Sequence, residues 1–368
     1  MNITYLIDPN TNSNKYLTES SGYIAKALEK RGCKITYLNL PLRKYDVSTV
    51  IKQVFRKNIL RTFADNSDHD LARKQALKIS ELIKINTDII FSTLINPVAY
   101  LSTNIPIVVY SDNTFSGKNY LEQSAILNSD LAIFSTEWSA KNAMSNYRID
   151  PLKIAVIPFG ANINEPISIG IINNVVKHRR GDILKLLFVS THWDVNAQRA
   201  LDITEALNER GLPTELHIYG VGRNYPVKSK HIIKHEVEKT KINRNFKLTE
   251  LIKDCHFLFL PELNDCASEL FSRANAYGLP VITTNTKGND SIIKDNLNGI
   301  VFPEDALPDT FTNYIQATYL DYEAYESLCL TSFDEYQNHL NWDTAAVKII
   351  GLLERVKLVN ELWTFGSN

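Results

Sequence analysis

The sequence is short of cysteine, of long apolar runs and of net charge, and each shortage excludes a class of protein. Only four cysteines occur among 368 residues, far apart and with no Cys-x-x-Cys pair, so free thiols in a reducing compartment are expected. The apolar runs are too short to cross a bilayer. A formal net charge of −1 gives no basic field, so nucleic acid is not an expected partner.

The sequence also lacks the marks of an export signal and of a metal site. The first residues, MNITYLIDPN, have neither a basic start nor a long apolar stretch, so a cytoplasmic protein is expected. His231 and His235 lie four residues apart but have no acidic or cysteine partner at ligand spacing, so no metal is expected. With 44% hydrophobic and 22% charged residues, the composition is that of a globular protein, and the chain is long enough for two domains.

What the sequence does contain is two series of short apolar strands that alternate with helical patterns. In the first series we expect strands at 3–7, 34–38, 88–92, 105–110, 131–135 and 154–157. A second series begins with a strand over 184–189 and a helix over 196–210. Strand–helix–strand units with right-handed crossovers build parallel sheets. The sequence therefore predicts an α/β protein with two Rossmann-like domains.

The domain boundaries follow from a change in composition between the two series. Residues 163–182 contain Pro166, Gly170, a pair of asparagines and a basic run, which is typical of a linker. We expect an N-terminal domain over 1–165, a linker over 166–183, a second domain over 184–345, and a final helix and tail over 346–368.

One stretch of the second series, DCASELFSRANAYGLPVITT over 265–284, carries more information than the rest. It follows an apolar strand and gives a loop, a helix, a Gly-Leu-Pro break and another apolar strand. Ligands of open parallel sheets bind outside the carboxyl ends of the strands, where this loop and the start of this helix would lie. The stretch therefore predicts a site for a phosphorylated ligand.

The same stretch resembles the donor-site signature of retaining glycosyltransferases of the GT-B fold, family 4 (glycosyl transferases group 1). In that signature an acidic residue is followed, after seven residues, by Glu-Ala and then by small-Gly-x-Pro-Val. Asp265 stands at the first acidic position, and Arg273 stands where the family has Glu. Further matches, in the order and spacing of the family, are YSDNTF, LAIFSTEWSAKNA, DPLKIAVIPFGAN, ELHIYGVG, KDNLNGIVF and NHLNWDTAA. The resemblance implies two domains that face each other across a cleft and a last helix that crosses back to the first domain.

The resemblance also implies an activity and a set of partners. The chain would move a sugar from a nucleotide donor, a UDP- or GDP-sugar, to a glycan or lipid-linked acceptor with retention of configuration. The front-face mechanism of such enzymes needs no metal, no cofactor and no enzyme nucleophile, because the leaving phosphate oxygen helps to deprotonate the acceptor. Peripheral contact with the inner face of a membrane and pairing with an active homologue both stay open.

The resemblance places the candidate site residues in loops at the carboxyl ends of strands. Asp265 would orient the donor sugar as one catalytic acid, and Asp112 is the other candidate, although a turn or cap role explains it equally well. The expected donor-binding residues are Ser190, Thr191, His192, Asn196, Arg199, Gly220, Cys266, Ala267, Ser268, Glu269 and Arg273. The expected acceptor-side residues are Ser21, Gly22 and Thr114.

Three donor-side positions depart from the family together. Asn196 stands in place of a Lys, Ala197-Gln198 in place of Gly-Gly, and Arg273 in place of the Glu that accepts hydrogen bonds from the ribose. A guanidinium has only donors, so Arg273 would instead bind a phosphate, pair with Asp265, or pair with Glu269 one turn earlier. A second hypothesis is therefore a catalytically impaired homologue that acts as a binding or scaffold subunit.

Two further alternatives stay open. Arg199 is the cation nearest to a phosphate in its loop, but a surface role explains it as well. An epimerase or a pyridoxal phosphate-dependent phosphorylase of the same shape has weaker support. No lysine can be assigned to a Schiff base, and His192 is the single candidate for the epimerase chemistry.

Overall fold

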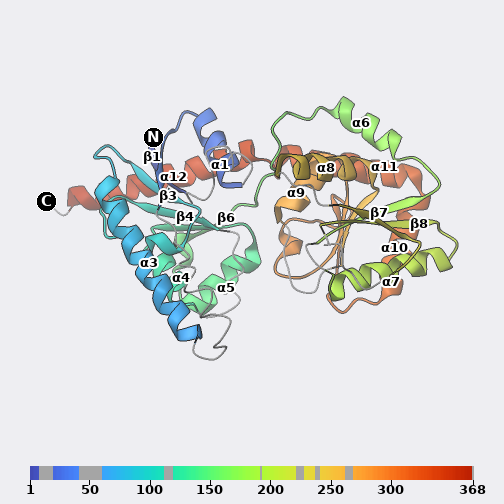
Figure 1. Ribbon diagram of the computed structural model, residues 1–368. Coiled ribbons are helices and arrows are strands. Elements are labelled where there is room, and N and C mark those ends of the chain that lie inside the picture. The colour runs from blue at the N-terminus through green and yellow to red at the C-terminus, as the bar shows by residue number, and fades with distance from the viewer. Residues whose placement is uncertain are drawn as a thin grey trace. The chain divides into compact units, whose positions relative to one another are not determined.

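The computed structural model describes residues 1–7, 20–40, 60–111, 119–190, 193–220, 228–236, 241–261 and 268–366 (Figure 1). The chain divides into two compact units, the first formed by Met1–Ile157 with Ala346–Asn368 and the second by Pro158–Ala345. None of the described helices combines the length and the apolarity that a bilayer crossing requires.

The first unit is built on a six-stranded parallel sheet with the order β2-β1-β3-β4-β5-β6. Its strands are β1 (Asn2–Ile7), β2 (Lys34–Asn39), β3 (Ile89–Ser92), β4 (Ile107–Ser111), β5 (Leu131–Phe134) and β6 (Ile154–Val156). All residues of β3, β4 and β5 are buried. Helices cover both faces of the sheet, so its parallel strands are buried on both sides and consist mainly of continuous apolar residues.

The helices of the first unit cover the two faces of this sheet. They are α1 (Ser20–Lys30), α3 (Leu60–Leu82), α4 (Tyr120–Leu127), α5 (Glu137–Tyr147) and most of α12 (Trp342–Gly366), with short 3-10 turns η2 (Asn96–Val98) and η3 (Pro151–Lys153). Figure 1 shows α3, α4 and α5 on one side of the sheet and α1 and α12 on the other. Tyr5, whose hydroxyl is bonded to the Ser21 carbonyl in α1, stacks on Phe91 with ring centroids 5.4 Å apart.

The second unit has its own six-stranded parallel sheet with the order β12-β11-β10-β7-β8-β9. Its strands are β7 (Leu184–Val189), β8 (Thr214–Tyr219), β9 (Ile232–His235), β10 (Phe257–Leu260), β11 (Val281–Thr284) and β12 (Gly299–Phe302). Its helices are α6 (Ile169–His178), α7 (Val195–Glu209), α8 (Lys241–Asp254), α9 (Ser268–Ala276), α10 (Pro308–Leu320) and α11 (Tyr322–Asn338), with a 3-10 turn η4 (Asn289–Ser291). The prediction of two Rossmann-like domains is confirmed by these two sheets.

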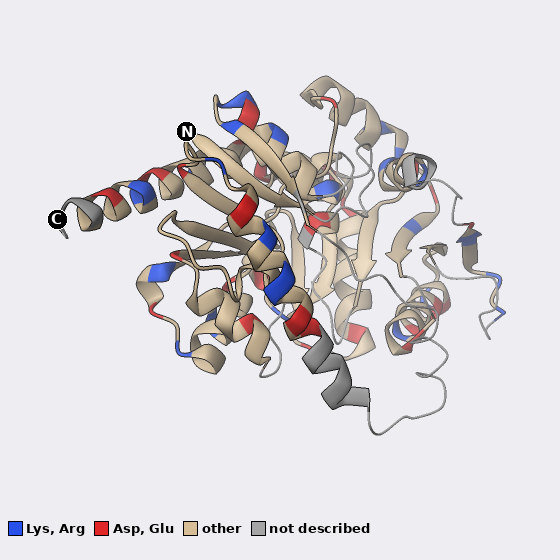
Figure 2. Cartoon of the chain, turned by 60° about the vertical axis from the view of Figure 1, so that its left-hand side comes forward, with Lys and Arg blue, Asp and Glu red and all other residues tan. Residues whose placement is uncertain are grey.

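The last helix packs on the first unit, as the fold prediction requires. Lys357 Nζ lies 2.9 Å from Asp88 Oδ1, and the other oxygen of the same carboxylate accepts a hydrogen bond from the Asn2 amide at 2.7 Å. These contacts join α12 to the amino end of the first sheet. Acidic and basic residues alternate along the outer part of α12 instead of gathering by sign (Figure 2), in keeping with a chain of small net charge.

The stretch expected to be a linker, 166–183, differs from that expectation. It forms α6, which Ser168 caps by accepting a hydrogen bond from the Ile171 amide, and Ile172 and Val176 are fully buried in the core of the second unit. The basic run that follows is not wholly solvated, because Arg179 is 3% exposed. Proline, glycine and asparagine in this stretch suggested a linker, whereas the i,i+4 spacing of Ile172 and Val176 is what determines a packed helix.

Candidate functional site

The sheet of the second unit reverses its strand order between β7 and β10. From β7 the chain moves outward to β8 and β9, and from β10 it moves outward on the other side to β11 and β12. Loops that leave the two central strands diverge at such a point, so a ligand site forms outside their carboxyl ends. The predicted donor segments, 190–199 and 265–273, follow β7 and β10 respectively. Topology alone therefore indicates the same edge as the sequence motif.

Two of the predicted donor-binding residues, Ser190 and Gly220, lie in direct contact at this edge. The Ser190 amide donates a hydrogen bond to the Tyr219 carbonyl at 3.0 Å, which extends the pairing of β7 and β8 by one residue. Gly220 has a φ of +105°, and a Cβ at this position would collide with the Ser190 carbonyl oxygen. Both the backbone conformation and the close approach therefore require glycine.

The start of α7 is already occupied by a carboxylate from the chain itself. Asp194 Oδ1 accepts hydrogen bonds from the amides of Asn196 at 3.0 Å and Ala197 at 3.1 Å. The amides of a helix N-terminus and its dipole attract an anion, and here the Asp194 cap fills that role. Asn196 is thus a capped first-turn residue, in the place where the family carries a lysine.

Arg199, the second predicted donor contact on α7, is bonded to a distant loop. Its Nη2 donates to the Ala306 carbonyl at 2.6 Å and its Nη1 to the Glu304 carbonyl at 3.2 Å. The guanidinium carbon also lies 5.0 Å from the centre of the Phe311 ring. Burial lowers the pKa of this guanidinium, while the negative charge of Glu304 acts to raise it. These contacts attach α7 to the loop between β12 and α10.

Arg273, which replaces the family glutamate, points toward α8. Only 6% of this residue is exposed, and its Nη2 donates to the Asn245 carbonyl at 2.7 Å and to Thr249 Oγ1 at 2.9 Å. Its Nε is buried without a hydrogen-bond partner among the described residues. Within the same described ranges, no ion pair joins Arg273 to Glu269, so the expected i,i+4 pair is not formed.

Glu269, in the first turn of α9, also makes a distant contact. Its Oε1 accepts a hydrogen bond from the Asn162 amide at 3.1 Å. Burial raises the pKa of this carboxyl, while the charge of Arg273 and the bond from Asn162 act in the opposite direction. The carboxyl is therefore held by the protein itself.

In the first unit, the predicted acceptor-side residues Ser21 and Gly22 lie in the first turn of α1. Tyr5 Oη donates a hydrogen bond to the Ser21 carbonyl at 2.8 Å, and Gly22 is buried. The first sheet reverses its order between β1 and β3, and α1 is the helix that follows β1. Both residues are thus carried by the helix that leaves a central strand of that sheet.

Several predicted site residues cannot be placed. Those outside the described residues are Asp112, Thr114, Thr191, His192, Asp265, Cys266 and Ala267. Ser268 is the first residue of α9, with only its backbone described. Their roles stay predictions.

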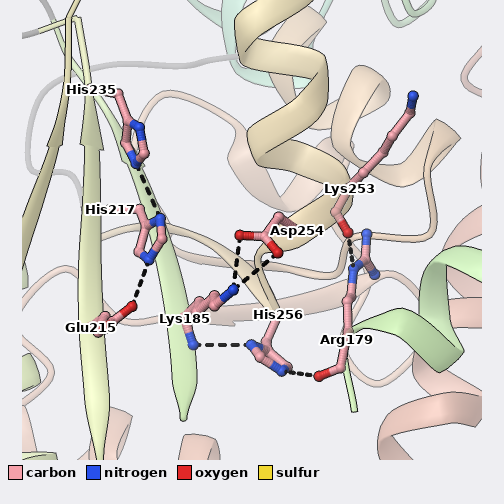
Figure 3. A network of polar contacts seen from close by, with 8 residues as sticks. All are labelled: Arg179, Lys185, Glu215, His217, His235, Lys253, Asp254 and His256. Carbon is pink, nitrogen blue, oxygen red and sulfur yellow. Dashed lines mark hydrogen bonds and ion pairs between the residues drawn. The ribbon is translucent and has the colours of Figure 1, made fainter. Parts of the chain in front are cut away.

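Sequence reasoning did not identify a buried polar network at the amino ends of β7 and β10 (Figure 3). His256 Nδ1 accepts a hydrogen bond from the Lys185 amide at 3.0 Å, so its proton lies on Nε2, which contacts the Arg179 carbonyl at 2.5 Å. Burial lowers the pKa of His256 to about 4. Lys185 Nζ also forms an ion pair with Asp254 at 2.9 Å. These residues belong to the opposite edge of the sheet from the candidate site.

A second group of polar contacts lies on β8 and β9 and contains two stacked histidines. His235 Nε2 lies 3.1 Å from His217 Nδ1, and His217 Nε2 lies 3.0 Å from Glu215 Oε2 (Figure 3). Burial lowers the pKa of both rings, that of His235 to about 4. Among the described residues no group of three or more His, Cys, Asp or Glu side chains could hold a metal ion. The ion pair between Lys185 and Asp254 attaches the end of α8 to β7.

The protein family that matches this chain covers most of its second unit. Residues 182–329 match the family described as glycosyl transferases group 1. No curated protein matches the sequence. Similar solved structures include sucrose-phosphate synthase from Thermosynechococcus elongatus, with 11% identity, a TM-score of 0.63, and coverage of 98% of this chain and 100% of that one.

Two further solved structures are similar over nearly the whole chain. WaaG, a glycosyltransferase involved in lipopolysaccharide biosynthesis, has 14% identity and a TM-score of 0.61, covering 95% of this chain and 99% of that one. HepE from Anabaena, in complex with UDP and glucose, has 12% identity and a TM-score of 0.60, covering 96% of this chain and 100% of that one. At these identities the likeness concerns the fold. The chain therefore has the GT-B fold of two-domain glycosyltransferases, and its residues 182–329 match the family of glycosyl transferases group 1.

Proposed function

We propose that the chain is a glycosyltransferase that binds a nucleoside diphosphate sugar at the carboxyl ends of β7 and β10. The observation that carries this proposal is the reversal of strand order between these two strands, inside the segment that matches the family. The complex of the similar HepE with UDP and glucose supports the choice of ligand class. The acceptor is a hydroxyl of a glycan or of a lipid-linked sugar.

The proposed reaction retains the anomeric configuration. The bond between the anomeric carbon and the β-phosphate oxygen breaks, and a bond from the same carbon to the acceptor oxygen forms on the same face. The acceptor proton moves to the leaving phosphate oxygen, so the products are a glycoside and a nucleoside diphosphate. Helix N-termini and fixed dipoles stabilise the charge that develops on the leaving group. The start of α9, directly after the loop that contains Asp265, is the N-terminus suited to this task.

A second candidate function, a donor-binding or scaffold subunit without turnover, is favoured by specific contacts. Arg199 is bonded to the loop at 304–306, and Arg273 is bonded to α8. The cap on α7 comes from Asp194. Both predicted arginines and one of the two helix starts are therefore engaged within the protein, and the diphosphate must be held by other groups.

One experiment separates the two functions. The protein is titrated by calorimetry with UDP-glucose, UDP-galactose, UDP-N-acetylglucosamine and GDP-mannose, and release of the nucleoside diphosphate is then measured with and without sugar acceptors. Turnover of any donor that is lost in Asp265→Asn supports the transferase. Binding without turnover supports a donor-binding subunit, and the absence of binding by all four donors counts against the transferase and favours a scaffold subunit.

A further inference from the structure

The chain passes between its two units twice, between Ile157 and Pro158 and again between Ala345 and Ala346. The residues next to these passages, inside the second unit, are here named the connecting segments, 158–162 and 340–345. They are bonded to each other although they lie far apart in sequence. The Ala161 amide donates to the Leu340 carbonyl at 3.0 Å.

Side chains join the two connecting segments more closely still. Trp342 Nε1 donates a hydrogen bond to Asn162 Oδ1 at 2.9 Å, and the Trp342 ring centroid lies 5.5 Å from that of Phe159. A Cβ added to Gly160 would lie 2.5 Å from the Trp342 amide nitrogen and 2.6 Å from the Asn341 carbonyl carbon. With no room between them, neither segment can shift without moving the other.

Helix α9 is attached to the first connecting segment at two points. Ser272 Oγ donates to the Phe159 carbonyl at 2.7 Å, and Glu269 Oε1 accepts from the Asn162 amide at 3.1 Å. Residues three apart lie on the same face of a helix, so both bonds come from one face of α9. Asn162 is thus bonded on its backbone to Glu269 and on its side chain to Trp342.

We propose that Glu269 is a positioning residue that couples the start of α9 to both connecting segments through Asn162. The bond to the Asn162 amide reaches the first segment, and the bond from Asn162 to Trp342 carries the restraint to the second. Because α9 begins directly after residues 262–267, which include Asp265, the functional consequence of this coupling rests on the proposed function. A donor bound at the start of α9 would restrain both connecting segments as well.

A simpler explanation of Glu269 is the ordinary preference for an acidic residue at the start of a helix, where it interacts with the dipole. Glu323 in the first turn of α11 is such a residue, and it is exposed. Glu269 differs because its oxygen is bonded to a backbone amide 107 residues away. A glutamine at this position would keep the accepting oxygen and lose the charge, so it distinguishes the two explanations.

The test is hydrogen exchange resolved to single amides, in the full chain and without ligand. Glu269→Ala is expected to speed exchange of the Asn162 amide about tenfold or more, with faster exchange also in 340–345, because the protecting acceptor is removed. Glu269→Gln is expected to behave as the wild type, and the control Glu323→Ala is expected to leave both segments unchanged. An unchanged Asn162 amide in Glu269→Ala, or faster exchange in Glu269→Gln, overturns the proposal.

A second variant keeps the test decisive where Glu269→Ala does not fold. Asn162→Ala keeps the backbone amide and removes the bond from Trp342. We expect the amide of residue 162 to stay protected while exchange in 340–345 becomes faster; the reverse pattern overturns the coupling. UDP is added in a separate arm, where it should protect both segments in the wild type and neither in Glu269→Ala. If UDP does not bind the wild type, GDP is used in the same arm; if neither binds, the proposed function fails, and the ligand-free arms still decide the role of Glu269.

Discussion

Arg273 in α9 donates a hydrogen bond from Nη2 to the backbone carbonyl of Asn245 in α8, at 2.7 Å. The same nitrogen bonds Thr249 Oγ1 at 2.9 Å, so one guanidinium joins two helices of the second unit. The residue that replaces the family glutamate thus holds α8 against α9. A role in packing and a role in donor binding then make different predictions.

Arg273→Lys is expected to lower the free energy of unfolding by about 1.5–3 kcal/mol, because an ammonium cannot keep the forked charge-assisted bonds to α8. UDP affinity should stay within about twofold, since packing and not the nucleotide engages this side chain. Thermal unfolding and calorimetry measure the two quantities, with Arg73→Lys on an exposed face of α3 as the control. A large loss of affinity at unchanged stability would instead identify Arg273 as a nucleotide contact.

Gly220→Ala is expected to destabilise the second unit and to weaken donor binding. The left-handed backbone costs about 1–2 kcal/mol for alanine, and the collision with Ser190 adds about 1–3 kcal/mol and displaces the loop after β7. Gly211→Ala is a matched control, because Gly211 also has a positive φ, of +81°, but an added Cβ meets no atom within 4 Å. Equal melting temperatures for the two variants would contradict the close approach at Ser190.

The lowered pKa of His256 predicts that the protein loses stability in mild acid. Its pKa is lowered to about 4 by burial, below the usual value of 6.5, so the unfolded chain takes up a proton before the folded protein does. The stabilisation is therefore complete above pH 6.5 and is lost as the pH falls from 6.5 toward 4, by an amount on the order of 3 kcal/mol. His235, whose pKa is also about 4, acts in the same direction.

Melting temperatures of the wild type and of His256→Asn, measured across this pH range, test the prediction. Asparagine keeps an acceptor for the Lys185 amide but does not titrate, so the variant should lose less stability on acidification. His339→Asn, at an exposed position, should follow the wild type. Parallel curves for His256→Asn and the wild type would show that His256 does not contribute to the acid sensitivity.

Lys357→Met is expected to loosen the end of α12 from the first unit. Burial acts to raise the pKa of Asp88, but the Asn2 amide and Lys357 outweigh it, so the net shift is downward and the carboxylate is stabilised. The pair is partly exposed, so its removal should cost about 1 kcal/mol or less and should matter less in high salt. Limited proteolysis of residues 346–366 reports the loosening, and Lys348→Met on the same helix is the control. Equal cleavage rates in low salt would contradict a role for the pair.

The strands of both sheets were predictable because fully buried parallel strands are continuous apolar runs. The strand over 184–189 is observed with the predicted bounds, and the one over 131–135 ends one residue earlier. The edge of the sheet that carries the candidate site followed from the order of these strands. Local sequence was sufficient here, because the burial of a strand and its formation both depend on consecutive residues.

The hydrogen-bond partners of the arginine side chains were not predictable, because they lie far away in the sequence. Arg179 appears in a basic run, yet its guanidinium donates to the carbonyls of Ile252 and Gly278 at the ends of α8 and α9. Arg199 likewise reaches carbonyls more than a hundred residues away. A cation can be buried only where acceptors converge from several elements. That convergence depends on the packed fold and leaves no signal near the arginine itself.

Because the first unit is closed by α12, its polypeptide is interrupted by the whole of the second unit. During synthesis the ribosome delivers β1 to β6 before the second unit and residues 346–366 after it. The face of the first sheet on which α12 lies therefore remains without this helix while residues 158–345 are translated. The synthesis of the first unit therefore begins before that of the second unit and is completed after it.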